Sequence, residues 1–155
     1  MRKSVFVKVS GDSCLSDDFI SKLRELSKRY FIVICVGGGT QINQALEKTG
    51  LPRTSHGPLG RELPTLKLRQ LARDVLEQNQ ADLQDKLARL KIPATVIIPV
   101  LDVGTVLCHV NGDEFLKIAY LGFDRLILIT TPDRVENKQK QFSQFPKIEV
   151  CSCNN

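Results

Sequence analysis

The stretch that decides the fold is Phe31-Ile-Val-Ile-Cys-Val-Gly-Gly-Gly-Thr-Gln-Ile-Asn43. It begins with an unbroken apolar run rich in β-branched residues, which predicts a strand buried on both faces, as in a parallel sheet. Three glycines follow, and Thr40 is then expected to cap a helix that ends at Gly50 and Pro52. A buried strand joined by a glycine loop to a helix indicates an α/β fold.

The same alternation extends outward toward both ends of the chain. On the N-terminal side, a strand at 5–10 leads to a helix that Ser16 caps and that closes at Arg29. On the C-terminal side, a loop at 53–62 precedes the longest predicted helix, 64–90, whose apolar stripe is broken by Asn79. The other predicted elements are strands at 94–100, 105–110 and 125–131, a helix at 111–122, and an edge strand at 147–151 that follows a polar loop.

Strands that alternate with helices predict a single α/β domain over residues 1–155, a three-layer α-β-α sandwich with a mostly parallel sheet. Ligands bind such sheets at the carboxyl ends of the strands. We therefore expect one crevice, surrounded by the segments that follow the strands. These segments are Ser10-Gly11, Gly37 to Thr40, Val100 to Gly104, and Thr130-Thr131.

The composition argues against several classes of partner. The formal net charge is +5, but the 22 basic residues are interleaved with acidic ones and aromatic residues make up only 6%. Nucleic-acid surfaces need massed positive charge and aromatic platforms, so we expect no nucleic-acid partner. No apolar run approaches the roughly 20 residues of a membrane helix, so we expect no membrane partner.

The cysteines and the N-terminus favour a cytoplasmic protein. Five cysteines form an odd set without a CxxC pair, and no secretory segment precedes the first strand. We expect Cys14, Cys35 and Cys108 to be reduced thiols in or near the core. Cys151 and Cys153 are expected in an exposed tail, where they could oxidise or bind a soft metal. With only two histidines in the chain, we predict no metal site.

Two features have the chemistry of an anion site. Lys8 lies in the last half of a buried strand, and its amine would project toward the strand end, where a phosphate could pair with it. The alternative is an edge lysine that reaches to solvent. Gly37 to Gly39 allow a ligand to approach the backbone at a helix start, where free N–H groups favour an anion. The alternative there is a tight turn without a ligand. The loop matches neither GxGxxG nor GxxxxGK[ST].

Several segments, spaced along nearly the whole chain, form a combined pattern. They are Lys8-Val-Ser-Gly11, Gly37-Gly-Gly-Thr-Gln-Ile-Asn43, Leu59-Gly-Arg61, Val110-Asn-Gly-Asp113 and Leu121 to Thr130. In this order they resemble the amino acid kinase family. The glycine loop is similar to that of the acetylglutamate kinases, and Ser10-Gly11 is also similar to the bacterial uridylate kinases.

The resemblance implies phosphoryl transfer from ATP, accompanied by Mg²⁺, to a small carboxylate or phosphate acceptor, with an acetylglutamate-like acceptor favoured. It implies that Lys8 neutralises the transferring phosphoryl group and that Asp113 orients this lysine. It implies a substrate side made of Gly37, Gly38, Gly39, Arg61 and Asn111, in which the arginine clamps a carboxylate. It implies a nucleotide side made of Ser10, Gly11, Thr130 and Thr131.

The residues themselves leave other roles open. Arg61 could be a solvated loop residue, and Asp113 could be only a helix cap. If the site is real, the Lys8 ammonium and the Asp113 carboxylate should point into one crevice beside Gly37 to Gly39.

The chain also departs from the family pattern. Thr131 and Arg134 stand where the family usually carries an aspartate and a later glycine, and His109 stands where acetylglutamate kinases place a substrate asparagine. A second lysine lacks a counterpart, because Lys138 and Lys140 fall in the predicted polar loop. No substrate-covering hairpin is expected between Val100 and Val110. The sequence ends at Asn155, before the family's remaining nucleotide-binding part.

Two main functional classes follow. The first is a minimal kinase that completes its nucleotide site across a homo-oligomer or with a second chain. The second is a non-catalytic module that binds a small anion or pairs with itself or a full-length kinase. An unrelated parallel-sheet nucleotide binder is a third alternative.

Overall fold

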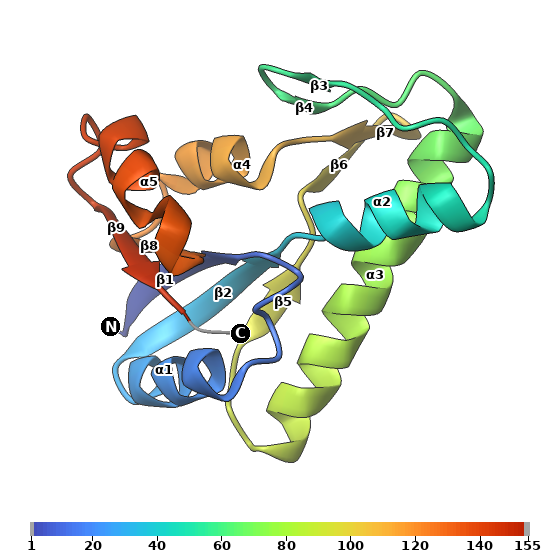
Figure 1. Ribbon diagram of the computed structural model, residues 1–155. Coiled ribbons are helices and arrows are strands. Elements are labelled where there is room, and N and C mark those ends of the chain that lie inside the picture. Colours follow the sequence, from blue (N-terminus) through green and yellow to red (C-terminus); the bar gives the residue numbers. More distant parts are fainter. Residues whose placement is uncertain (1, 154–155) are drawn as a thin grey trace.

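The centre of the molecule is a parallel sheet, as the sequence predicts. The computed structural model describes residues 2–153, and its main sheet has five strands in the order β5-β2-β1-β8-β9, every neighbouring pair parallel (Figure 1). The strands are β1 (Lys3–Val9), β2 (Tyr30–Val36), β5 (Thr95–Ile97), β8 (Arg125–Thr130) and β9 (Ile148–Ser152). The predicted edge strand near residue 150 is therefore confirmed.

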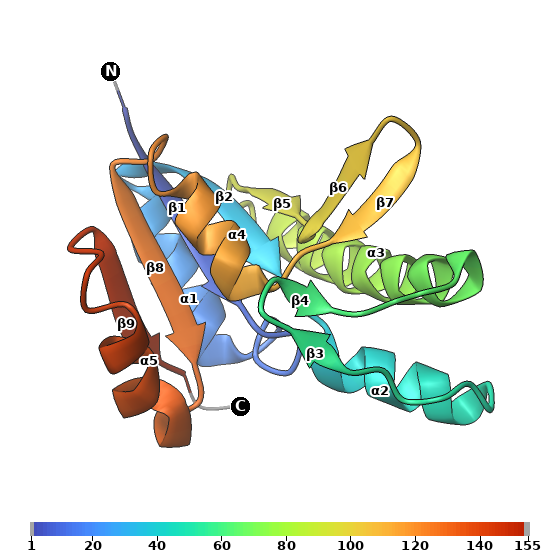
Figure 2. The same ribbon diagram turned by 90° about the horizontal axis from the view of Figure 1, so that it is seen from above.

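Helices cover both faces of this sheet and complete a three-layer α/β sandwich. On one face, α1 (Asp17–Ser27) and α3 (Leu66–Arg89) pack on the alternating valines of β1. On the other face lie α4 (Gly112–Ala119) and α5 (Val135–Gln141). The helix α2 (Gly39–Lys48) packs on the first half of α3, beyond the carboxyl ends of the strands (Figures 1 and 2).

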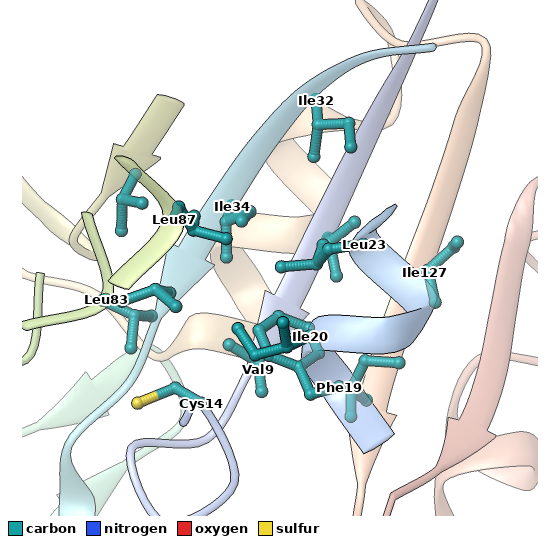
Figure 3. Close-up of a cluster of buried hydrophobic side chains, with 14 of the residues drawn as sticks. Val9, Cys14, Phe19, Ile20, Leu23, Ile32, Ile34, Leu83, Leu87 and Ile127 are labelled. Carbon is teal, nitrogen blue, oxygen red and sulfur yellow. The ribbon is translucent and has the colours of Figure 1, made fainter. Parts of the chain in front are cut away.

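The period of two along β1 assigns its side chains to the two faces. Val5, Val7 and Val9 enter the core with α1 and α3, while Phe6 enters the core with α4 and α5. Figure 3 shows the first of these cores, where side chains of α1 and α3 meet the strands. Lys8 lies two residues after Phe6 on β1, so its side chain points to the same face of the sheet, the face covered by α4.

Side-chain or glycine caps close three helix ends, of which the Ser16 cap and the Gly50 end were predicted, whereas the Thr65 cap was not. The Ser16 hydroxyl accepts the Phe19 N–H (3.3 Å) at the start of α1, and Thr65 does the same for Leu68 (3.3 Å) at the start of α3. At the end of α2, Gly50 has φ +67° and the Leu51 N–H bonds to the Leu46 carbonyl (3.0 Å). This is the Schellman geometry expected of a glycine after a helix.

The start of α2 differs from the prediction. Thr40 lies within the helix and does not cap it, because the cap position falls on Gly38, which has no side chain to accept a bond. The Thr40 hydroxyl donates to Asp12 Oδ2 (2.8 Å), in the loop after β1. The glycine loop is therefore linked to the first loop of the chain.

Two hairpins replace segments predicted otherwise. Within 53–62, β3 (His56–Gly57) and β4 (Gly60–Arg61) form a short hairpin. The predicted strand 94–100 ends at Ile97, and β6 (Val100–Val103) pairs antiparallel with β7 (Val106–His109). The predicted strand at 105–110 is confirmed as β7, and a hairpin is present between Val100 and Val110, where the sequence predicted no substrate-covering hairpin; its residues 100–104 do not line the cleft described below. Gly104 and Thr105 both have positive φ and close the type of two-residue turn that hairpins favour.

The segment after β8 is helical, and the predicted polar loop was wrong. A single turn, η1 (Pro132–Arg134), leads into α5, whose seven residues include no buried side chain. The helix is held by Phe142 and Phe145, which follow it and pack on the sheet face with Leu126. Helical periodicity cannot reveal such a helix, because its apolar contacts come after its last residue.

The C-terminal cysteines are less exposed than predicted. Cys153 is buried at the start of α1, where its thiol contacts Asp18 Oδ2 (3.1 Å), and Cys151 is partly buried in β9. Burial raises the pKa of both thiols. Cys14 and Cys35 are buried as predicted, and Cys108 is partly buried. None of the helices between residues 2 and 153 is both long and apolar enough to cross a membrane.

The core packing of α3 predicts a large effect for one truncation. Leu87 is fully buried between α3 and the sheet. Leu87→Ala should lower the free energy of unfolding by about 2–5 kcal/mol, the usual cost of such a cavity. Urea unfolding measures this loss. The matched control is Leu121→Ala, because Leu121 is 92% exposed and its truncation should change stability by less than about 0.5 kcal/mol.

Candidate functional site

A polar cleft of about 350 Å³ opens at the carboxyl ends of β1, β2 and β8. The loops that follow these strands form its floor, and the β3–β4 hairpin and the start of α4 form its walls. It brings together ten of the eleven site residues expected from the sequence: Lys8, Ser10, Gly37, Gly38, Gly39, Arg61, Asn111, Asp113, Thr130 and Thr131.

The exception is Gly11, which lies behind the cleft surface. A Cβ at this position would lie 2.6 Å from Gln41 Oε1 and 2.7 Å from the Gly37 carbonyl oxygen. Gly11 is therefore needed for the close packing of two loops, and it does not line the cleft. The segment Val100 to Gly104 is also absent from the lining, because it turns away into the β6–β7 hairpin; Pro99, His109 and Val110 take its place.

Lys8 and Asp113 form the central ion pair of the cleft. The Lys8 Nζ lies 3.3 Å from Asp113 Oδ1, and the two side chains are only 17% and 8% exposed. The prediction that they point into one crevice is confirmed. The alternative of an edge lysine is wrong, because β1 lies in the middle of the sheet between β2 and β8.

The start of α4 places the carboxylate. Asn111 is the helix cap, and its Oδ1 accepts the Asp113 N–H (2.8 Å), so Asp113 is not itself the cap. Burial by itself raises the pKa of the Asp113 carboxyl, but the nearby Lys8 and Lys138 ammonium groups outweigh it, and the pKa lies below its ordinary value. Asp113 is therefore ionised at neutral pH.

Lys138 is a site residue that sequence reasoning missed. Its Nζ donates to Asp113 Oδ2 and to Gln141 Oε1 (2.8 Å), and its side chain lines the cleft. The prediction that Lys138 lies in a loop unsuited to the site was wrong, because the residue is on α5. The carboxylate of Asp113 thus bridges two lysines that come from β1 and α5.

The glycine loop faces these lysines across the cleft. Gly37 N–H donates to the Val9 carbonyl (2.9 Å), which continues the β1–β2 pairing, and α2 begins at once after Gly38 without a side-chain cap. The first N–H groups of a helix lack partners within the helix and carry partial positive charge. An anion in the cleft would find these groups free of a competing side-chain cap.

Asn79 supports this loop from α3 and was also missed. Its Nδ2 donates to the Gly37 carbonyl (3.0 Å). A Cβ at Gly11 or at Gly38 would lie 2.8 or 2.9 Å from the same nitrogen, so the amide fits only because both positions are glycine. The sequence signal that could have indicated this contact is that Asn79 is a polar residue within the otherwise apolar stripe of α3.

Arg61 lies on the hairpin wall and is held in place. Its guanidinium donates to Thr54 Oγ1 (3.1 Å) and to the Gly39 carbonyl (3.4 Å), and burial lowers its pKa. It lines the cleft and is not a freely solvated loop residue. The hairpin is attached to the start of α4, because the Asn111 N–H donates to the Leu59 carbonyl (2.7 Å).

His109, at the position of an expected substrate asparagine, already has a partner. Its Nε2 lies 2.9 Å from the Arg69 carbonyl, and burial lowers the pKa of the ring. The ring therefore favours the neutral form and helps to attach β7 to α3. A neutral His109 ring contributes to the shape and polarity of the cleft wall and adds no positive charge to it.

The charges of the cleft favour an anionic ligand. Lys8, Arg61, Arg134 and Lys138 outnumber the carboxylates of Asp12 and Asp113, and the starts of α2 and α4 add positive potential. Between residues 2 and 153, no group of three or more His, Cys, Asp and Glu side chains could hold a metal ion.

Comparison of the sequence with models of known protein families found no match, and a search of curated proteins found none either. The resemblance to the amino acid kinase family therefore rests on the motifs quoted above.

The ion pair predicts a specific dependence of stability on pH. Because the pKa of Asp113 is lowered in the folded state, its carboxylate contributes stability that is fully present above the unfolded pKa of about 3.9 and is lost as the pH falls through the folded value. Asp113→Asn should therefore be destabilising at pH 7, and the difference from wild type should shrink below about pH 4. Urea unfolding between pH 3 and 7 measures this, with the exposed Asp85→Asn as control. A difference that does not change with pH would contradict the ionic role.

Gly112 predicts a second effect. A Cβ at this position would lie 2.8 Å from Lys8 Cε, so Gly112→Ala should displace the flexible lysine and leave the fold intact. Loss of one charged contact should weaken binding of inorganic pyrophosphate roughly tenfold. Isothermal titration calorimetry measures the change. Gly122→Ala is the control, because the nearest heavy atom to a Cβ there is 4.0 Å away, and its affinity should equal that of wild type.

Proposed function

We propose that the cleft is a phosphoryl-transfer site, in which Mg-ATP is the donor and a small carboxylate or phosphate is the acceptor. The observation that carries this proposal is the arrangement of Lys8 and Lys138 on the two oxygens of the buried Asp113, opposite the uncapped glycine loop. Phosphoryl transfer depends mainly on such positioned positive charge, because the developing negative charge is spread over phosphate oxygens.

The roles of the residues follow from their positions. The ammonium groups of Lys8 and Lys138 would neutralise the transferring phosphoryl group, and Asp113 would keep both side chains aimed at it. The N–H groups at Gly38 and Gly39 would bind phosphate oxygens at the start of α2. Ser10, Thr130 and Thr131 would contribute hydroxyl donors on the nucleotide side.

The chemistry of Asp113 favours an acceptor that is already an anion. A carboxylate or phosphate oxygen can attack phosphorus without losing a proton, whereas an alcohol requires a general base. Asp113 is a poor base, because two ammonium groups lower the pKa of its carboxyl. Arg61, on the β3–β4 hairpin, and Asn111, at the cap of α4, would hold the far end of an acetylglutamate-like acceptor.

The size of the cleft favours a second candidate, a non-catalytic module that binds a small anion. A volume of about 350 Å³ lies near the lower end of the roughly 300–1,000 Å³ of ligand pockets. It suits one small anion better than a nucleotide and an acceptor together. For catalysis, a second copy or another chain would then have to complete the nucleotide side.

Thermal-shift titration separates the two candidates. Mg-ATP at about 100 times its dissociation constant should stabilise the wild type by roughly 2.7 kcal/mol and raise the midpoint by several degrees. Lys8→Ala and Lys138→Ala should each reduce this shift, while Lys140→Ala should leave it unchanged, because Lys140 is 73% exposed and pairs with Glu136.

Phosphorus NMR with Mg-ATP and candidate acceptors then tests the transfer itself. Formation of ADP and a phosphorylated acceptor by the wild type, and not by Lys8→Ala, supports the kinase. Stabilisation by small carboxylates or phosphate without stabilisation by Mg-ATP supports the binding module. No stabilisation by any of these anions would contradict both.

A further inference from the structure

Among the described residues that line the cleft, Asp12 is the carboxylate that takes part in no ion pair, and its side chain is exposed. It follows the Ser10-Gly11 turn and lines the cleft close to the glycine loop. Among residues 2–153, no lysine, arginine or histidine nitrogen lies within ion-pair distance of it. Asp113, in contrast, is buried and contacts two ammonium groups.

The position of this carboxylate is fixed by neutral donors. Its Oδ2 accepts the Thr40 hydroxyl (2.8 Å) and its Oδ1 accepts the Gln41 side-chain amide (3.0 Å). Both donors belong to the first turn of α2, which contains no acidic residue of its own and has Gly38 at its cap position, without a side-chain cap. A full negative charge is thus held at the helix end where the anion is expected to bind.

This arrangement has two opposite effects on a polyphosphate. A negative charge beside the site repels a bare polyanion. A hard divalent cation reverses this effect, because Mg²⁺ is usually held by one or two carboxylates together with substrate phosphates. The described residues offer no cluster that could hold a metal alone, so the cation would arrive on the phosphates.

We propose that Asp12 is a specificity-determining residue, which makes the cleft discriminate against bare polyphosphates and in favour of their complexes with a divalent cation. The inference deepens the proposed function and rests on it. The competing structural role is a latch between the first loop and α2, made by the same two hydrogen bonds. The two roles predict opposite effects of removing the Asp12 carboxylate. If Asp12 only links the first loop to α2, its loss should weaken binding of a bare polyphosphate; if its charge repels the polyphosphate, its loss should strengthen that binding.

The test is calorimetric titration of the full chain with inorganic pyrophosphate, in EDTA and in excess Mg²⁺. Asp12→Asn removes the charge and keeps the size of the side chain. In EDTA it should bind pyrophosphate roughly tenfold more tightly than wild type, and in Mg²⁺ this gain should disappear or reverse. The control is Asp85→Asn, which removes an equal charge from the exposed side of α3 and should match wild type in both buffers.

A second variant, Asp12→Ser, removes the charge with a smaller acceptor and should reproduce the gain if Asp12→Asn folds poorly. Equal or weaker binding of these variants in EDTA would overturn the inference and leave Asp12 as a latch. The proposed function would survive that result if Lys8→Ala still weakens binding. If neither wild type nor the variants bind pyrophosphate in either buffer, the proposed function fails, and the inference fails with it.

Discussion

The Lys8–Asp113 ion pair is the constraint to which the rest of the site conforms. A lysine in the middle strand of a parallel sheet cannot reach solvent at a sheet edge, and because the Lys8 side chain is only 17% exposed, leaving its ammonium unpaired would be unfavourable. A carboxylate therefore has to meet it, and α4, which is capped by Asn111 and begins at Gly112, brings Asp113 to the strand end. A side chain at Gly112 would meet the stem of Lys8, which passes over this position, and would displace the ammonium from Asp113.

Segments distant in sequence are tied to the same small region by single hydrogen bonds. The β3–β4 hairpin is attached to the start of α4 through the Leu59 carbonyl, and α3 is attached to the glycine loop through Asn79. The side chains that would bind an anion are thereby held in place before the anion arrives. Such pre-organisation reduces the entropy cost of binding, and it serves a binding module as well as an enzyme.

The sequence predicts the fold better than it predicts the site. The strands of the main sheet and the helices α1, α3 and α4 are marked by apolar residues and by helix-end signals, and these local signals suffice to place Lys8 and Gly37 to Gly39 near the strand ends. Lys138 could not be placed, because α5 has no apolar stripe and is held by Phe142 and Phe145 beyond its end. The β6–β7 hairpin was missed because Gly104-Thr105 is a weak turn signal, and Asn79 because its partner lies 42 residues away.

The charge balance at Asp113 distinguishes the requirements for binding one anion from those for phosphoryl transfer. One carboxylate faces two ammonium groups, so a net positive charge stays in the cleft and an anion that enters restores neutrality. Binding of one anion needs nothing more. Transfer needs a second anion within reach of the same two lysines. The phosphoryl group then passes from one anion to the other, and the two lysines reduce the repulsion between them. The distinction between a binding module and a kinase therefore depends on whether the cleft, alone or completed by another chain, can hold two anions at once.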